Sequence, residues 1–235
     1  MTNPHKVTQD FEQAICEYTG APFAVATTSC SMALLLAVAW HLSEMQRKID
    51  DEDKANGSGI RRQALFPPIE IPKRTYLSVP MSIIHAGGRP TFRDEEWSGG
   101  YQLKPLDVWD CARIFTSGMY RGEPGPYWHT GGFRDRRGHM LCVSFHASKT
   151  LGIEQGGAIL HDDPEADEWL RRARFDGRKS GVAPQDDKNI ILGWHAYMNP
   201  STAAALILKL YSLPKHNEPL PNDPYPDLST LEVFK

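Results

Sequence analysis

Hydrophobic side chains recur with helical spacing in some segments of the chain and form short unbroken runs in others. Phe11, Ile15 and Tyr18 fall on one stripe, which predicts an amphipathic helix over residues 11–19. The run from 23 to 27 is apolar and predicts a short buried strand. By the same criteria we expect further helices at residues 32–48, 79–86, 164–175 and 201–211, and further strands at 69–71, 89–93, 106–109, 140–145 and 158–160.

Strands alternate with helices along most of the chain, and polar or Gly- and Pro-rich stretches at 50–64 and 119–139 predict excursions between them. This order predicts an α/β protein with a mostly parallel central sheet flanked by helices. We expect residues 1–213 to form one domain. Five prolines fall between residues 214 and 226, so we expect residues 214–235 to form an extended arm.

Composition narrows the class of protein. The formal net charge of −3 shows no basic excess of the kind that accompanies nucleic-acid binding. The four cysteines lie in apolar segments without metal-ligand spacing, which indicates reduced thiols and no metal site. The N-terminus lacks a signal-peptide profile, and the longest apolar run, nine residues from 32 to 40, is too short to span a bilayer. We therefore expect a cytoplasmic protein with no membrane partner.

Thr28-Ser-Cys-Ser31 lies where the first strand passes into a long helix. Such a junction offers free backbone N–H groups and the positive end of the helix dipole, and these residues add hydroxyls. Ser29, Cys30 and Ser31 are therefore candidates for holding a phosphate. Ordinary capping of the helix is the alternative.

Two further side chains suggest a ring-shaped ligand. Asp110 closes an apolar strand, where it is expected to be poorly solvated, and an ionised carboxylate there needs a positive partner. The alternative is an ordinary aspartate at the end of a strand. Tyr76 follows Pro72-Lys-Arg-Thr75 and is suited to stacking on a flat ring, with burial in the core as the alternative.

Lys149 follows the strand at 140–145, with Ser144 five residues before it and Gly156-Gly157 soon after. Desolvation at such a position lowers the pKa of the lysine and frees its amine for attack on an aldehyde. A surface lysine is the alternative. What favours the reactive lysine is the order of the parts: phosphate cup, aromatic residue, aspartate, serine with lysine, diglycine. Pyridoxal 5′-phosphate (PLP) requires a cradle for its dianion, a platform for its ring, a carboxylate for its nitrogen and an amine for its aldehyde.

The chain resembles the DegT/DnrJ/EryC1/StrS aminotransferases, the sugar aminotransferase branch of the fold-type I PLP enzymes. The resemblance extends over about residues 9–211, and its most specific block is Ser144-Phe-His-Ala-Ser-Lys149. The other matching stretches are 11–20, 23–34, 72–76, 108–112, 156–157 and 193–198. The resemblance implies a fold-type I large domain. The small C-terminal domain of the family is expected to be largely absent.

By resemblance, Lys149 is the internal-aldimine (Schiff-base) lysine and Asp110 is the partner of the pyridine nitrogen. His195 stands where the family has an asparagine that reaches the phosphate of the neighbouring subunit's cofactor, which implies a homodimer with shared active sites. The residues so assigned to the cofactor are Ser29, Cys30, Ser31, Tyr76, Asp110, Arg113, Ser144, Lys149 and His195. The implied activity is transfer of an amino group, from a donor such as glutamate, to a carbonyl of a sugar or nucleotide-linked substrate.

Some positions depart from the family pattern. Arg113 replaces a glutamine or histidine and is a charge that can bind a carboxylate or phosphate; Gln155 replaces a glutamate and Tyr197 an arginine. Arg113 and the expected absence of the small domain keep open PLP-dependent elimination or decarboxylation on an amino-acid-like group, including one attached to a nucleotide or nucleic acid. The shortened chain keeps open a non-catalytic PLP-fold partner subunit. Basic residues that could meet the phosphates of a nucleic acid lie at positions 134, 136, 137, 171, 172, 174, 178 and 179.

Overall fold

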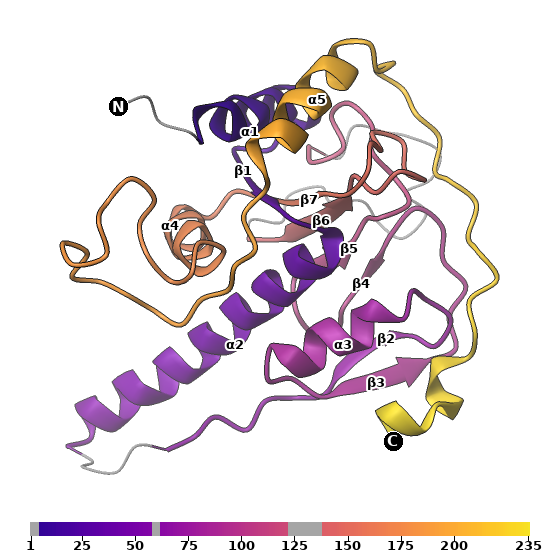
Figure 1. The fold of residues 1–235 in the computed structure, drawn as a ribbon. Helices are drawn as coiled ribbons and strands as arrows, with labels where there is room; N and C mark the ends of the chain where they lie inside the picture. Colours follow the sequence, from indigo (N-terminus) through magenta and orange to yellow (C-terminus); the bar gives the residue numbers. More distant parts are fainter. Residues whose placement is uncertain (1–4, 58–61, 122–137) are drawn as a thin grey trace.

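The computed structural model describes residues 5–57, 62–121 and 138–235 (Figure 1). Its helices are α1 (Lys6–Thr19), α2 (Cys30–Ala55), α3 (Ser78–His85), α4 (Pro164–Ala173) and α5 (Pro200–Tyr211), followed by the 3-10 turns η1 (Leu228–Thr230) and η2 (Glu232–Phe234). Its strands are β1 (Phe23–Thr27), β2 (Ile69–Pro72), β3 (Pro90–Arg93), β4 (Tyr101–Gln102), β5 (Val108–Asp110), β6 (Met140–Ser144) and β7 (Gly157–His161). The predicted helices and strands are confirmed, and the two-residue strand β4 is an addition.

The helix α2 is longer than its apolar pattern predicts. It begins after Ser29, whose side chain accepts a hydrogen bond from the N–H of Met32 at 3.2 Å. It continues through the polar stretch to Ala55, so the excursion expected from residue 50 begins as helix. Ion pairs three residues apart on its exposed face, such as Arg47 with Glu44, support this polar half. In Figure 1, α2 crosses one face of the molecule and its C-terminal end projects away from the sheet.

The expectation of a mostly parallel central sheet is wrong. The five-stranded sheet has the order β1-β7-β6-β5-β4, and β5 with β6 is its one parallel pair. The reason is the connections: β6 turns into β7, and β4 into β5, through short segments without a helix, which return the chain antiparallel. The unit β2-α3-β3 does contain a crossover helix, and its two strands are parallel in a separate two-stranded sheet.

Strand direction nevertheless brings the predicted site residues to one edge. β1 and β6 are both antiparallel to β7, and β5 is parallel to β6, so β1, β5 and β6 all run the same way. Their carboxyl ends therefore share an edge, where Ser29, Asp110 and Lys149 follow or end the strands. β7 and β4 begin at that same edge, which brings Gly157 beside Thr27 and Tyr101 beside Asp110.

Helices cover both faces of this sheet and give it two apolar cores. One core joins the α2 residues Leu35 and Val38 to Val108 and Ile159 of the strands. The other core lies under α1 and α5, where the ring of Phe11 packs edge-on against that of Phe145. Alternate side chains of the buried strands point to opposite cores, as the two-residue period of a strand requires. This packing fixes the strands, and the site edge with them.

The arm, residues 214–235, lies along its own chain and is drawn in yellow along one side of Figure 1. Its backbone is held at intervals: the N–H of Leu220 donates to the carbonyl of Arg113 at 2.8 Å, and that of Leu228 to the carbonyl of Lys73 at 2.8 Å. The side chain of Leu228 is fully buried. The arm therefore spans the molecule from α5 to β3 and passes the site edge on the way.

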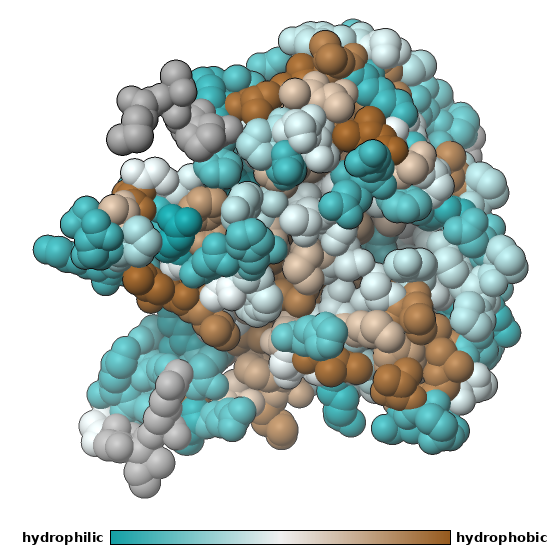
Figure 2. All heavy atoms as spheres, viewed as in Figure 1, coloured by the Kyte–Doolittle hydropathy of each residue, from teal (hydrophilic) through white to brown (hydrophobic). Residues whose placement is uncertain are grey.

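The surface carries some exposed apolar side chains. Figure 2 shows apolar surface over α5 and around α3, where Leu208, Tyr211 and Ile84 are exposed. Within the described ranges, no helix combines the length and the apolar character needed to cross a membrane.

Candidate active site

A cavity of about 350 Å³ lies at the shared edge of the strands. It brings together all the predicted cofactor residues except His195: Ser29, Cys30, Ser31, Tyr76, Asp110, Arg113, Ser144 and Lys149. These residues come from segments far apart in the sequence, and the common direction of β1, β5 and β6 explains why they meet.

Asp110 is a buried carboxylate in the wall of this cavity. Its Oδ1 accepts a hydrogen bond from the N–H of Ala112 at 2.9 Å, and its Oδ2 accepts one from the hydroxyl of Tyr101 at 2.8 Å. Burial raises the pKa of Asp110, while these two hydrogen bonds lower it. Among the described residues no cation forms an ion pair with it. The site therefore holds a desolvated carboxylate that a cationic ligand group would stabilise.

Lys149 stands in the loop after β6, with its backbone N–H bonded to the carbonyl of His146 at 2.8 Å. Burial lowers the pKa of its amine, and the charge of Arg113 lowers it further. Within the described part of the chain, its Nζ makes no hydrogen bond or ion pair. The amine is thus partly desolvated and available for reaction, as the sequence predicts for a reactive lysine.

The N-terminus of α2 forms one end of the cavity. The first N–H groups of a helix have no partner within the helix. In α2 the N–H of Met32 donates to the side chain of Ser29 and that of Ala33 to the carbonyl of Ser29, which leaves the N–H groups of Cys30 and Ser31 without a partner among the described residues. The capping alternative is therefore correct for Ser29, and it leaves two N–H groups over for an anion.

Close packing fixes this end of the cavity. A Cβ on Gly157 would lie 2.5 Å from the backbone nitrogen of Cys30, so a side chain there would displace the start of α2. Gly156 precedes it with a φ of +149°, a conformation that favours glycine. The diglycine that the sequence singles out thus allows β7 to approach the anion-binding turn.

Tyr76 and Ser144 complete the predicted set. The side chain of Tyr76 is 61% exposed and lines the cavity, so burial in the core, the alternative for this residue, is wrong. Ser144 ends β6 and is buried, and its hydroxyl accepts a weak hydrogen bond from the N–H of His146 at 3.4 Å. Tyr76 thus presents an aromatic ring, and Ser144 a hydroxyl, at the cavity wall.

Sequence reasoning missed a group of residues that line or support the cavity. Tyr101 and Thr75 support Asp110, and Trp97, Asp223 and Tyr225 line the cavity. The ring of Tyr225 stacks on that of Trp97 with a centroid separation of 6.2 Å. Tyr101 lies in a strand of two residues, and Asp223 lies in a proline-rich segment without periodicity. Neither carries a sequence signal for its place in the site.

His195 lies apart from the cavity. It pairs with Phe175 in an isolated bridge, and its Nδ1 lies 3.1 Å from Oδ1 of Asp176. Its side chain is 71% exposed. The chain therefore does not bring His195 to its own candidate site.

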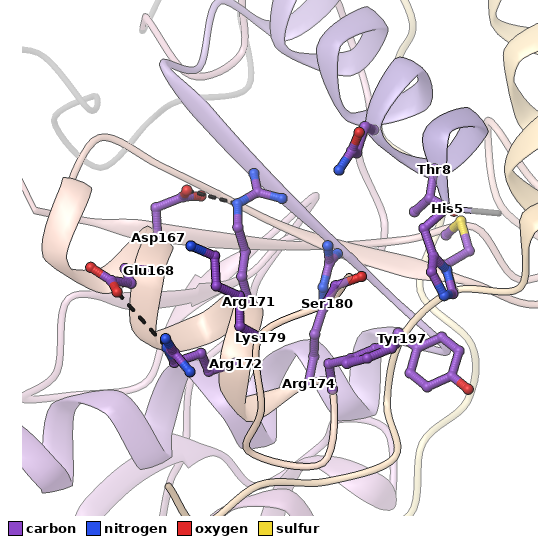
Figure 3. A pocket seen from close by; sticks show the side chains of 13 residues that line it. His5, Thr8, Asp167, Glu168, Arg171, Arg172, Arg174, Lys179, Ser180 and Tyr197 are labelled. Carbon is purple, nitrogen blue, oxygen red and sulfur yellow. Dashed lines mark hydrogen bonds and ion pairs between the residues drawn. The ribbon is translucent and has the colours of Figure 1, made fainter. Parts of the chain in front are cut away.

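A second cavity, of about 470 Å³, lies between α1, α4 and the segment after α4 (Figure 3). Its three arginines are paired with carboxylates: Arg171 and Arg174 both bind Glu12, which is buried, and Arg172 binds Asp187. Figure 3 also shows the contacts of Arg171 with Asp167 and of Arg172 with Glu168. Arg171, Arg172 and Arg174 therefore form structural ion pairs and do not present a free basic face. Arg134, Arg136 and Arg137 lie outside the described residues.

The donor set of the first cavity fits PLP. The phosphate dianion of PLP matches the two remaining N–H groups of α2, its ring nitrogen matches the desolvated Asp110, and its aldehyde matches the amine of Lys149. Each match rests on a polar group that the described chain leaves unsatisfied or poorly solvated. The second cavity offers no comparable set.

Comparison with known proteins identifies the family of this chain. The sequence profile of the DegT/DnrJ/EryC1/StrS aminotransferase family matches residues 1–51 and 129–219, which is more than half of the chain. The chain belongs to this family. The spore coat polysaccharide biosynthesis protein SpsC of Bacillus subtilis (strain 168) is 24% identical over 191 residues, which are 69% of this chain and 44% of that protein.

Solved structures of the family share the fold. The PseC aminotransferase of Helicobacter pylori, which is involved in the biosynthesis of pseudoaminic acid, aligns with a TM-score of 0.61 at 18% identity, over 88% of this chain and 58% of PseC. GDP-4-keto-6-deoxymannose-3-dehydratase (ColD), solved with bound GDP-perosamine, aligns with a TM-score of 0.63 at 16% identity, over 89% of this chain and 61% of ColD. The chain thus matches fold-type I aminotransferase structures over part of their length, and it spans about half the length of the relatives that it matches.

Proposed function

We propose that this chain binds PLP through Lys149 and transfers an amino group from a donor such as glutamate to a carbonyl of a sugar or nucleotide-linked substrate. The observation that carries the proposal is the convergence of Asp110, Lys149 and the α2 N-terminus on one cavity. Together with membership of an aminotransferase family, this convergence favours catalysis over the alternative of a non-catalytic partner subunit.

Three groups would hold the cofactor. The N–H groups of Cys30 and Ser31, with the hydroxyls of Ser31 and Ser144, would bind the phosphate. Tyr76 would lie against the ring. Asp110 would pair with the protonated ring nitrogen. When bound, PLP supplies an electron sink that stabilises negative charge on the substrate carbon.

The protein's own part in the reaction is proton transfer at Nζ of Lys149. Because the pKa of this amine is lowered, a larger share is neutral near pH 7 than for an ordinary lysine. The neutral amine at Nζ of Lys149 would accept a proton from the substrate carbon, and the resulting ammonium would hold that proton for its return in the next step. Arg113 favours the neutral form and so assists the first of these steps.

Tyr101 and Thr75 have a positioning role in this proposal. Tyr101 donates to Asp110, and Thr75 lies 2.5 Å from the Tyr101 hydroxyl. Because the phenol hydrogen is committed to Asp110, the Thr75 hydroxyl donates to the phenol oxygen. This chain of donors favours the ionised form of Asp110, which is the form that can pair with a cation.

The substrate class is supported by the relatives. SpsC is named for the biosynthesis of a polysaccharide, PseC is involved in the biosynthesis of pseudoaminic acid, and ColD was solved with the sugar nucleotide GDP-perosamine. A sugar or sugar-nucleotide carbonyl is therefore the first acceptor to test. ColD is named a dehydratase, so elimination on the same scaffold is the second reaction to test.

We also infer that two copies of the chain form the working enzyme. His195 is mostly exposed and lies apart from the cavity of its own chain, which suits a residue that completes the site of a neighbour. His195→Ala would then lower the affinity for PLP without changing the fold. Mixing it with Lys149→Ala would restore one intact site per mixed dimer. Recovery of activity on mixing supports shared sites, and no recovery argues against them.

A donor screen tests the reaction. The PLP-loaded chain is incubated with single L-amino acids without acceptor, and released 2-oxo acid, ammonia and carbon dioxide are measured. We expect about one equivalent of 2-oxo acid from the correct donor, because transamination without acceptor stops after one half-reaction. Release of carbon dioxide or ammonia without stoichiometric 2-oxo acid would overturn aminotransfer and favour decarboxylation or elimination.

A further inference from the structure

Arg113 is a buried cation whose anionic partner comes from the arm. The residue is 5% exposed and lines the cavity. Its Nη2 contacts Oδ1 of Asp223 at 3.1 Å and donates to the carbonyl of Pro221. Burying a guanidinium is unfavourable unless an anion accompanies it. Here that anion is Asp223 of the proline-rich arm, and both Arg113 and Asp223 line the same cavity as Lys149.

The contact between Arg113 and Asp223 is incomplete. The Nε of Arg113 is buried and has no hydrogen-bond partner among the described residues. An arginine can bind a carboxylate with two parallel hydrogen bonds, whereas Asp223 contacts Arg113 at Nη2. A carboxylate that engaged both Nε and Nη2 would therefore satisfy a donor that Asp223 leaves unsatisfied.

Asp223 is also easy to displace. Its side chain is 63% exposed, against 6% for Arg113, so its carboxylate can return to water at little desolvation cost. Within the arm, the Asp223 carboxylate accepts one long hydrogen bond, from the hydroxyl of Tyr225 at 3.4 Å, and other contacts hold the backbone of the arm here. Asn222 donates to the carbonyl of Trp97 at 2.7 Å, and Tyr225 stacks on the ring of Trp97. A rotation of the Asp223 side chain would free the part of Nη2 that it contacts, while the backbone of the arm, including the Pro221 carbonyl that Nη2 also binds, stays in place.

We propose that Arg113 is the carboxylate-binding residue for the amino-acid donor, and that Asp223 occupies its place until the donor's carboxylate displaces it. The proposal rests on the proposed aminotransfer and specifies its donor side. Arg113 and Asp223 act in opposite directions on the amine of Lys149, which places this pair within electrostatic reach of the reacting group. The ligand class is a small carboxylate, the chemistry that Asp223 itself presents.

Binding of glutarate to the full chain, first without and then with PLP, tests this proposal. Glutarate carries the carboxylates of a donor but has no amine, so its binding does not depend on catalysis. We expect Asp223→Asn to tighten glutarate binding about tenfold, because the internal competitor has lost its charge. Arg113→Gln is expected to abolish glutarate binding. Glu218→Gln, an arm carboxylate paired with His216, is the matched control and should bind like wild type.

Each outcome decides the proposal. Equal glutarate affinity of wild type and Asp223→Asn would overturn it, as would full affinity in Arg113→Gln. If Arg113→Gln does not fold, Asp223→Asn beside Asp223→Glu keeps the test, because the glutamate variant retains the competing charge. Failure of Lys149 to capture PLP would overturn the proposed function instead. Glutarate binding to the PLP-free chain distinguishes the two failures.

Discussion

The hydroxyl of Tyr101 donates a hydrogen bond of 2.8 Å to Oδ2 of Asp110, and both side chains are buried. The strand β4 is two residues long, and its pairing with β5 sets Tyr101 directly opposite Asp110. Burial and this hydrogen bond act in opposite directions on the pKa of Asp110. The balance between them decides whether the carboxylate is ionised when a cationic ring nitrogen arrives.

Tyr101→Phe is expected to weaken PLP binding about fivefold at pH 7, because loss of the hydrogen bond costs about 1 kcal/mol and raises the pKa of Asp110 further. A titration of PLP absorbance measures the affinity. Tyr120→Phe is the control, since Tyr120 is also buried but donates to the carbonyl of His139 at 3.2 Å instead. Equal affinities for Tyr101→Phe and wild type would show that the phenol does not support Asp110.

The raised pKa of Asp110 predicts a pH dependence for the stability of the PLP-free chain. The folded chain holds this proton more tightly than the unfolded chain, so the contribution of Asp110 to stability is present below its ordinary pKa of 3.8 and is lost as the pH rises through the folded pKa. Asp110→Asn removes this loss. Urea unfolding between about pH 4 and about pH 7 should therefore show the variant gaining on wild type as the pH rises. A constant difference would contradict the raised pKa.

Glu12 is expected to change stability with pH in the opposite direction to Asp110. Arg174 and Arg171 hold the pKa of this buried carboxylate below its ordinary 4.5 against the effect of burial. Its contribution is present above that value and is lost as the pH falls through the folded pKa. Among the described residues, Glu12→Gln leaves Arg174 without a paired carboxylate and Arg171 with Asp167 alone, and we expect it to lower the free energy of unfolding by about 3 kcal/mol at pH 7. Glu17→Gln, on the same helix and exposed, should change it by less than about 0.5 kcal/mol in the same urea titration.

Gly157→Ala tests the close approach of β7 to the anion-binding turn. Its Cβ would lie 2.5 Å from atoms of Ser29 and Cys30, so we expect a loss of about 2 kcal/mol in stability and a weaker affinity for PLP. Ala158→Gly is the control, because it weakens the same strand without crowding the turn. Thermal unfolding and PLP titration of both variants separate the two effects. Unchanged PLP affinity in Gly157→Ala would mean that this turn does not hold the phosphate.

The sequence predicts the elements and the chemistry of the cavity better than it predicts the sheet. Apolar runs that end in Asp110 or shortly before Lys149 mark strand ends directly, because burial of both faces demands continuous hydrophobic residues. The direction of β7 depends on a connection without a helix, which periodicity does not reveal. The sequence also does not predict the residues that support Asp110 and Arg113, for a related reason. Tyr101 acquires its place by pairing with β5, and Asp223 through contacts of an arm that has no apolar period.

The reaction of Lys149 with PLP is the most direct test that this cavity is a PLP site. The full chain and Lys149→Ala are each mixed with PLP, their visible absorbance is recorded, and borohydride is added before peptide mass analysis. If Lys149 binds PLP, we expect a shifted, borohydride-sensitive band and a pyridoxyl group on the Lys149 peptide in the wild-type chain alone. Spectra identical to free PLP for both proteins, or a pyridoxyl group on other lysines at equal yield, would contradict it.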